Sequence, residues 1–140
     1  MPRITFEKYT NASIQKTFDT ITDFENFEKI LPDYYTSITV KSIREESSLV
    51  VEHLHLAGNE FIIMAKHFMK PPITHEMHVV GGDIKGSYII EKFNDISERT
   101  KITIDANINV SKLSKLNFKS SNYECEIKKL YQKFIDVIEN

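Results

Sequence analysis

The chain is predicted to be an α+β protein in which an antiparallel sheet packs against one long carboxy-terminal helix. A strand pattern comes first, two short helical patterns follow, and strand patterns then continue up to a final amphipathic helix. Because the sheet separates the final helix from the opening helices along the chain, that helix is expected to lie across the sheet. A curved sheet around a helix leaves a hollow between them, and this hollow is where function is expected.

The composition bounds the class of protein. The 140 residues are expected to form a single domain, 1–140, which is long enough to bury a core without a disulfide or a metal. The 18 basic and 20 acidic residues are interspersed, which argues against binding to nucleic acid. With Cys125 as its one cysteine, no signal-peptide pattern and no apolar run of about 20 residues, the chain is predicted to be soluble and cytoplasmic.

The opening elements follow from alternation and helical spacing. Residues 3–10 alternate between apolar and polar side chains, as a half-buried strand does. Asn11 or Ser13 can cap the next helix, since either side-chain oxygen can accept from free backbone N–H groups. Pro32 ends the second helix because the residue before a proline avoids helical geometry. The apolar residues at helical spacing are Ile14, Phe18 and Ile21, then Phe27, Ile30 and Leu31.

A series of strands is predicted from Tyr35 to Val110. Gly58-Asn59 is expected to form a two-residue hairpin turn, because both residue types tolerate positive φ. Pro71-Pro72 and Gly81-Gly82-Asp83 are expected to form two further turns. The last strand has one apolar and one polar face, which is typical of an antiparallel sheet with one side in water. Its apolar face consists of Ile102, Ile104, Ala106, Ile108 and Val110.

The chain is predicted to close with a connector and an amphipathic helix. The connector, Lys112–Ser120, carries apolar residues that would suit a lid or a transient membrane or protein contact. Ser121-Asn122-Tyr123-Glu124 has the pattern of a capping box and marks the helix start. The apolar stripe of the helix is expected to pack on the sheet, which is compatible with lining a cavity. Its members are Tyr123, Ile127, Leu130, Tyr131, Phe134 and Ile138.

Two stretches of the sequence resemble a known superfamily. The segment Asn11–Lys41, with NASIQKTFDTITDFENFEKILPDYYTSITV, resembles the opening of the SRPBCC superfamily, also called START-like or helix-grip. Asp23-Phe24, Phe27 and Leu31-Pro32 resemble its polyketide cyclase and coenzyme-Q-binding branch. The later GSYIIEKF and RTKITIDANI resemble the last two strands of that branch.

The resemblance implies a fold and a range of functions. The implied fold is a curved seven-stranded antiparallel sheet wrapped around the carboxy-terminal helix, with two short helices after the first strand. Members usually bind a hydrophobic or amphipathic ligand in the hollow. Some transfer lipids, some present quinones, and a minority are cyclases or other enzymes. The matched motifs are structural, so candidate site residues have to come from the register of the strands.

Propagating the register from the turns predicts which side chains face the hollow. The turn near residues 95–97 aligns the last two strands, and the turns at Gly58-Asn59 and Pro71-Pro72 align the central ones. The predicted opposed pairs are Leu54–Ile63, Leu56–Phe61, His67–Glu76 and Ala65–His78. The inner face would then be mainly apolar, and its titratable members would be Glu52, His67, Glu76, His78 and Glu91. Because buried charges are costly unless they are paired, these five groups need an explanation.

Three interpretations of the five groups stay open. In the first, a one-residue slip turns them to solvent and brings His53, His55, His75, Met77 and Tyr88 inward, although His75, beside the proline turn, is otherwise expected to be exposed. In the second, His67 and Glu76 pair across strands and orient the polar end of a ligand. In the third, His67 and His78 hold zinc or iron with one or more of the glutamates, although no HExxH pattern is present.

The sequence therefore predicts a binding protein for a hydrophobic small molecule such as a lipid, a quinone or a polyketide-like compound. The alternatives are a cyclase or hydrolase that uses His67 or His78 as the acid–base group, and a module that holds a peptide. No catalytic residue, metal or cofactor is part of the leading prediction. The predicted ligand-binding residues are Glu52, Leu54, Phe61, Ile63, His67, Met69, Glu76, His78, Ile89, Glu91, Phe93, Ile104, Ile127, Leu130 and Phe134.

Overall fold

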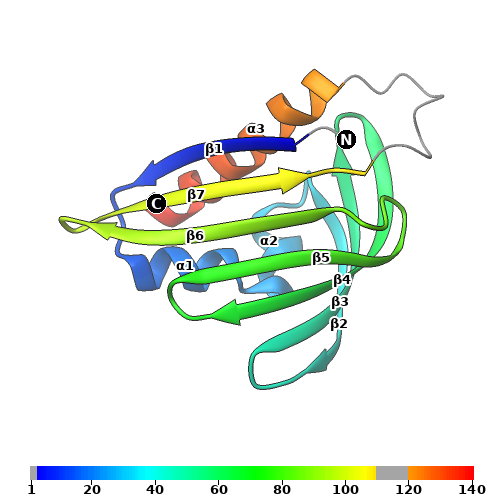
Figure 1. The fold of residues 1–140 in the computed structure, drawn as a ribbon, viewed down its shortest axis with the longest axis horizontal. Helices are drawn as coiled ribbons and strands as arrows, with labels where there is room; N and C mark the ends of the chain where they lie inside the picture. The colour runs from blue at the N-terminus through cyan, green and yellow to red at the C-terminus, as the bar shows by residue number, and fades with distance from the viewer. Residues whose placement is uncertain (1–2, 110–119) are drawn as a thin grey trace.

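Seven antiparallel strands form one strongly curved sheet, seen in Figure 1 in a computed structural model that describes residues 3–109 and 120–140. The strand order across the sheet is β1-β7-β6-β5-β4-β3-β2, so β1 is an edge strand that pairs with β7. This confirms the predicted α+β class. The strands are β1 (Arg3–Thr10), β2 (Tyr35–Ile43), β3 (Ser47–Leu56), β4 (Asn59–Lys70), β5 (Thr74–Gly82), β6 (Tyr88–Ile96) and β7 (Arg99–Asn107).

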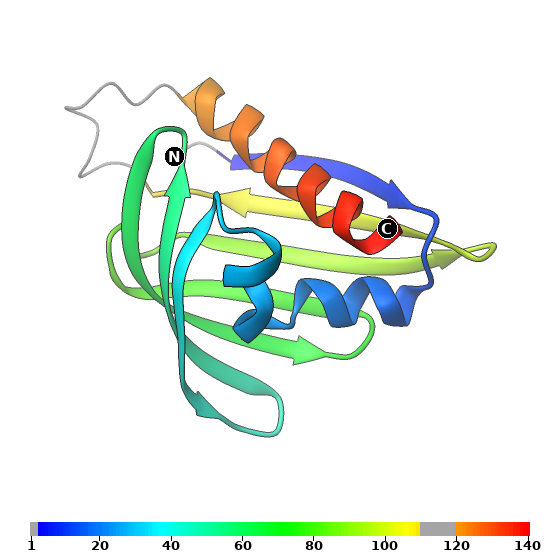
Figure 2. The ribbon, with the colours of Figure 1, turned by 180° about the vertical axis from the view of Figure 1, so that it is seen from behind.

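The helices all lie on the inner side of the sheet, as Figure 2 shows from behind. They are α1 (Ile14–Ile21), the 3-10 turn η1 (Phe24–Asn26), α2 (Phe27–Ile30) and α3 (Ser120–Glu139). Of the two predicted caps, Ser13 is the one that acts, because its side chain accepts from the backbone N–H of Lys16 at 3.2 Å. Within residues 3–109 and 120–140, no helix is long and apolar enough to cross a membrane.

The stripe of α3 packs against the sheet as predicted. All six of its predicted members are buried. At the far end of the helix, Glu139 accepts from the hydroxyl of Thr10 at 3.1 Å and from the backbone N–H of Asn11 at 2.8 Å. These two bonds tie the end of α3 to the end of β1. The predicted connector lid at 112–119 and the Ser121 and Asn122 side chains of the predicted capping box lie outside the described residues.

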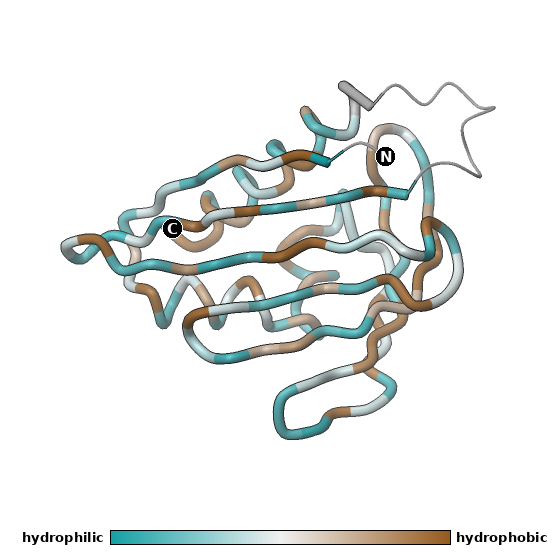
Figure 3. The backbone as a smooth tube through the Cα atoms, in the orientation of Figure 1, coloured by the Kyte–Doolittle hydropathy of each residue, from teal (hydrophilic) through white to brown (hydrophobic). Residues whose placement is uncertain are grey.

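Apolar and polar residues alternate along the strands, which Figure 3 shows as alternating brown and teal. The residues of one parity face α3 and are buried, and those of the other parity face solvent. The buried inner face includes Val50, Glu52, Leu54 and Leu56 on β3, Phe61, Ile63, Ala65 and His67 on β4, His75, Met77 and Val79 on β5, Glu91 and Phe93 on β6, and Ile102, Ile104 and Ala106 on β7.

The β3–β4 hairpin turns at Ala57-Gly58, one position earlier than predicted. Both residues have positive φ, 52° and 76°, which is the backbone that a two-residue hairpin turn needs. Leu54 is therefore opposite Phe61 and not Ile63, a shift of two residues from the predicted pairing. Because side chains alternate with a period of two, this shift leaves every residue of β4 on its predicted face.

The predicted register of the β4–β5 hairpin is wrong in a way that changes the candidate site. Lys70 pairs with Thr74, so three residues, Pro71 to Ile73, form the turn, and the strands are displaced by one residue from the predicted pairing. Ile73 belongs to this turn because its backbone N–H donates to the carbonyl of Lys70 at 2.8 Å. A shift of one residue exchanges the two faces of a strand, so β5 presents to the hollow the side chains that were predicted to face solvent.

On β5, the residues that face inward are His75 and Met77, and those that face outward are Glu76 and His78. The prediction that Glu76 and His78 face the hollow is thus wrong. The slip that the sequence left open as an alternative occurs in this hairpin alone, because Glu52 on β3 and His67 on β4 remain inside.

Gly81 and Gly82 belong to β5 and do not form the predicted turn, which begins at Asp83. A bulge separates the pairs Ala65–Val79 and Met64–Gly81. Gly82 has a φ of +80°, and a Cβ there would lie 2.3 Å from the carbonyl oxygen of Ile62. Only glycine fits this close approach of two strands.

Candidate functional site

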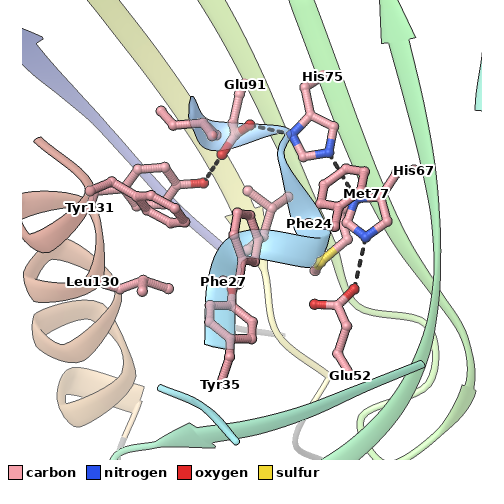
Figure 4. Close-up of a pocket in the computed structure, with 13 residues that line it drawn as sticks. Phe24, Phe27, Tyr35, Glu52, His67, His75, Met77, Glu91, Leu130 and Tyr131 are labelled. Atoms are coloured by element: carbon pink, nitrogen blue, oxygen red, sulfur yellow. Dashed lines mark hydrogen bonds and ion pairs between the residues drawn. The ribbon is translucent and has the colours of Figure 1, made fainter. Parts of the chain in front are cut away.

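A small cavity lies between the inner face of the sheet, α3 and the η1–α2 segment (Figure 4). Its volume is about 30 Å³. Aromatic and aliphatic side chains form most of the wall, and a line of polar groups crosses it. The lining residues are Ile21, Phe24, Phe27, Tyr35, Glu52, His67, His75, Met77, Ile89, Glu91, Leu130, Tyr131 and Phe134.

Five of these side chains form one continuous hydrogen-bonded line, here called the buried polar chain: Glu52, His67, His75, Glu91 and Tyr131. Oε2 of Glu52 contacts Nε2 of His67 at 2.8 Å, and Nδ1 of His67 contacts Nε2 of His75 at 2.8 Å. Nδ1 of His75 contacts Oε1 of Glu91, and the hydroxyl of Tyr131 donates to Oε2 of the same carboxylate. None of the five residues is more than 5% exposed.

Four neighbouring strands and one helix bring the buried polar chain together. Glu52 comes from β3, His67 from β4, His75 from β5 and Glu91 from β6, which are consecutive in the sheet. His75 and Glu91 are directly opposed in the register, so their contact follows from strand pairing. Tyr131 reaches the same carboxylate from α3. The buried polar chain thus spans the hollow from the sheet to α3.

The contacts fix how many hydrogens lie in the gaps between the four central groups. Each of the three contacts among Glu52, His67, His75 and Glu91 needs one hydrogen between its two heavy atoms. Two neutral imidazoles supply two hydrogens, so one further proton has to be shared by the line. With no further proton on Oε1 of Glu52, the two carboxylates carry two negative charges and the added proton offsets one of them, so the buried polar chain then has one net negative charge.

The contact between the two rings excludes a higher charge state of the pair. The 2.8 Å gap between Nδ1 of His67 and Nε2 of His75 has room for one hydrogen. Two imidazolium rings would place two hydrogens in that gap, so the rings cannot both be charged in this arrangement. The proton order can run from Glu52 towards Glu91 or in reverse, which makes the line a path along which a proton can move.

Burial shifts the pKa of two rings in the buried polar chain, His67 and Tyr131. Removal from water lowers the pKa of His67, although its hydrogen bond to Glu52 opposes that shift. Burial also raises the pKa of Tyr131 well above its usual range, and the adjacent Glu91 adds to the rise. Tyr131 is therefore a neutral hydroxyl that donates to Glu91 at ordinary pH.

Phe24 closes one side of the cavity. Its ring lies over His67, with ring centroids 4.0 Å apart, and 5.6 Å from the ring of His75. On its other side Phe24 also lines a surface groove of about 190 Å³ that includes Met69 and Ser48. Phe24 thus borders both the buried cavity and the groove.

The predicted site residues fall into four places. Glu52, His67, Ile89, Glu91, Leu130 and Phe134 line the cavity. Leu54, Phe61, Ile63, Phe93, Ile104 and Ile127 are buried in the core beyond it. Met69 lines the surface groove. Glu76 and His78 lie on the outer face, where they contact each other at 3.1 Å with side chains 44% and 40% exposed.

The predicted metal set is not assembled. His78 faces solvent while His67 is inside, and the described residues contain no group of three or more His, Cys, Asp or Glu side chains placed to hold a metal ion. His53 and His55 stay on the opposite face from Glu52, as the leading register predicted.

Sequence reasoning missed four important members of the site. His75 is buried where the leading register predicts exposure, and Phe24 and Phe27 were matched only as structural motifs. The hydroxyl of Tyr131 was counted as part of an apolar stripe, although a tyrosine that is buried usually needs a hydrogen-bond partner. That requirement, applied to the helix face that meets Glu91, was the available signal.

Acid should weaken the fold through His67. Its folded pKa is lowered below the value of 6.5 for the free side chain, so the unfolded chain binds the proton more readily. The stability that neutral His67 contributes is fully present above about pH 6.5 and is lost as the pH falls below it. Urea unfolding followed by circular dichroism from pH 7 to 5 should show a steeper loss for the natural protein than for His67→Gln. Equal slopes would contradict this role.

Comparison with known proteins identifies the fold. No protein-family model and no curated protein matches the chain. Among solved structures, TTHA0849 from Thermus thermophilus superposes with a TM-score of 0.80 at 14% identity, covering 98% of this chain and 97% of that one. A START superfamily protein from Mycobacterium smegmatis has a TM-score of 0.77 at 9% identity, with 98% and 97% covered.

A third neighbour carries an enzyme name. The Zhui aromatase/cyclase from Streptomyces sp. R1128 has a TM-score of 0.74 at 11% identity, with 98% of this chain and 90% of that chain covered. At these identities the comparisons establish the fold alone. The chain has the START-like helix-grip fold that the sequence resemblance implied.

Proposed function

We propose that the protein binds a small, mainly apolar molecule with one polar group in the hollow between the sheet and α3. The observation that carries this proposal is the buried polar chain set in an otherwise apolar cavity. Ligand sites combine apolar walls with a few polar groups that fix orientation. Leu130, Phe134 and Phe27 would contact the apolar part, and the polar chain would meet the polar group.

The ligand has to displace part of the wall. The cavity of about 30 Å³ is far smaller than the roughly 300–1,000 Å³ of ordinary ligand sites. The η1–α2 segment is the side that we expect to move, because η1 and α2 are single turns and neither has a side-chain cap. Outward movement of this segment would carry Phe24 and Phe27 away from the polar chain and join the cavity to the surface groove.

The structural neighbours support the class of ligand. A START superfamily protein and an aromatase/cyclase share the sheet-and-helix frame that encloses this cavity. A lipid, a quinone or a polyketide-like molecule is therefore the class that we propose for this chain. Each would place rings or methylenes on the apolar wall and its polar group on the buried polar chain.

Native mass spectrometry of the freshly purified protein tests the proposal first, followed by calorimetric titration with octanol as a neutral probe. We expect one bound molecule per chain. Leu130→Phe should abolish octanol binding because the larger ring fills the cavity that Leu130 lines. Ile138→Phe is the matched control, since Ile138 is buried on the same helix but does not line the cavity.

The two variants decide the outcome together. Loss of binding in Leu130→Phe with binding kept in Ile138→Phe supports the hollow as the site. Binding that survives in both variants would place the ligand elsewhere and overturn the proposal. Absence of any octanol binding to the natural protein would overturn it as well.

A second candidate function is acid–base catalysis on the bound molecule. The observation that favours it is the proton path through His67 and His75, with a carboxylate at each end. Methyl hexyl ketone in D₂O is a direct probe, because an acid–base site exchanges the hydrogens beside the carbonyl for deuterium. Exchange that the natural protein accelerates and His67→Ala does not, with ligand binding retained, would favour the enzyme.

A further inference from the structure

We propose that the hollow selects ligands whose polar group is a protonated amine and rejects carboxylates. This rests on the proposed function, because it specifies the ligand of the same site. Two observations carry it independently: the net charge of the buried polar chain and the aromatic surface beside Glu52.

The first observation is a buried negative charge without a counter-charge. With Oε1 of Glu52 unprotonated, the three contacts among the two glutamates and two histidines leave the buried polar chain with one negative charge. None of the described residues that line the cavity is lysine or arginine. A buried charge is unfavourable unless a partner of opposite sign or several hydrogen bonds offset it. A cationic ligand would supply that partner, and an anionic ligand would add a second charge of the same sign.

An oxygen is available to receive the cation. Glu52 contacts His67 through Oε2, and Oε1 of the same carboxylate has no hydrogen-bond partner among the described residues. Figure 4 shows this second oxygen pointing away from His67 into the pocket. An ammonium group has three hydrogens to donate and no acceptor, so it matches a free carboxylate oxygen. It cannot accept any of the hydrogens that the buried polar chain shares among its own groups.

The second observation is the aromatic surface around that oxygen. Phe27 packs against Tyr35 with centroids 4.9 Å apart and against Phe134 at 5.3 Å. All three rings line the cavity with Glu52. The faces of aromatic rings attract cations, and a cation held by rings and a carboxylate is the usual chemistry of amine recognition. A carboxylate ligand would meet the same negative ring faces and the charged chain, and would be repelled by both.

The test compares three probes that share one apolar tail and differ in the polar group. Octylamine, octanol and octanoate are titrated into the full chain at pH 7 by calorimetry. We expect octylamine to bind most tightly, octanol less tightly and octanoate least. A difference of about tenfold or more in affinity between octylamine and octanoate is the expected size for a partly screened charge at contact distance.

Two variants separate the net charge from the individual contacts. In Glu52→Gln the amide can donate to His67 and the remaining protons run towards Glu91, so every contact is kept and the net charge stays at one negative unit. In the double variant Glu52→Gln with Glu91→Gln every contact can again be made, but the charge is zero. Thermal unfolding of both variants checks that they fold, and Glu91→Gln alone can replace Glu52→Gln.

The outcomes are distinct. A preference for octylamine that persists in the single variant and disappears in the double variant supports the proposal. Octanoate binding as tightly as octylamine to the natural protein would overturn the selection while leaving a hydrophobic binding site in place. A preference unchanged in the double variant would also overturn it. If none of the three probes binds, the proposed function itself has failed.

Discussion

Replacing Glu91 by leucine should lower the free energy of unfolding by about 3–5 kcal/mol, the range for removing one partner of a buried charged pair. The substitution leaves Nδ1 of His75 and the hydroxyl of Tyr131 without their common acceptor, in a place where Glu91 is only 3% exposed. Each buried polar group without a partner adds to the cost. Urea unfolding followed by circular dichroism measures the change.

Two controls isolate the buried contact. Glu91→Gln keeps the shape and can still bond to both neighbours, so it should cost much less than the leucine variant. Glu76→Leu removes the other glutamate that contacts a histidine on β5, but that pair is on the outer face and about 40% exposed, and it should change stability by no more than about 0.5 kcal/mol. Equal losses in Glu91→Leu and Glu76→Leu would show that burial of the polar chain has no special weight.

Replacing Phe24 by alanine should have two effects at once. The ring is 6% exposed and packs on His67 and Phe27, so its loss should lower the free energy of unfolding by about 3–5 kcal/mol. It should also join the cavity to the surface groove, because Phe24 lines both, and so speed the entry of ligand. Stopped-flow mixing with an apolar fluorescent probe measures the entry rate, and urea unfolding measures the stability.

Phe18→Ala separates these two effects. Phe18 is 2% exposed and packs edge-on against Phe93 with centroids 5.1 Å apart, but it lines neither the cavity nor the groove. Its loss should cost a similar amount of stability without speeding entry. If both variants take up the probe at the same increased rate, general loosening of the fold explains the entry and Phe24 is not the barrier.

Local patterns in the sequence were enough to predict the fold. Alternation within each strand and the stripe on α3 are properties of neighbouring residues, and the structure preserves both. The order of elements then left few ways to bury the apolar face of α3 other than against the sheet. The bounds of the turns depend on one or two residues each, so periodicity along the strands does not specify them.

Predicting the candidate site required knowing which alternate residues of each strand face inward. The number of residues in each turn determines this. At the β3–β4 hairpin the error was two residues, so Glu52 and His67 were correctly placed inside. At the β4–β5 hairpin the error was one residue, because Ile73 extends the Pro71-Pro72 turn, and His75 and Glu76 exchanged faces. The pattern after the prolines reads equally well in either parity, since both faces of β5 carry a histidine and an apolar residue.

Facing inward was also not sufficient to place a residue at the cavity. Ile63, Phe93 and Ile104 face inward as predicted, but they are packed in the hydrophobic core and do not line the cavity. The cavity lies where η1 and α2 meet the sheet, and these short segments gave only a structural motif in the sequence. Where elements meet in space cannot be read from periodicity within each of them.

The pairing of β1 with β7 also determines when the sheet can be completed during folding. Every residue of β1, from Arg3 to Thr10, pairs with a residue on β7. Glu139 of α3 then holds the carboxy-terminal end of β1 through its hydrogen bonds with Thr10 and Asn11. A nascent chain has to keep β1 unpaired until β7, which ends at Asn107, has left the ribosome. Closure across so long a stretch of chain is slow, so we expect folding in milliseconds to seconds, with the edge of β7 open to wrong partners until β1 arrives.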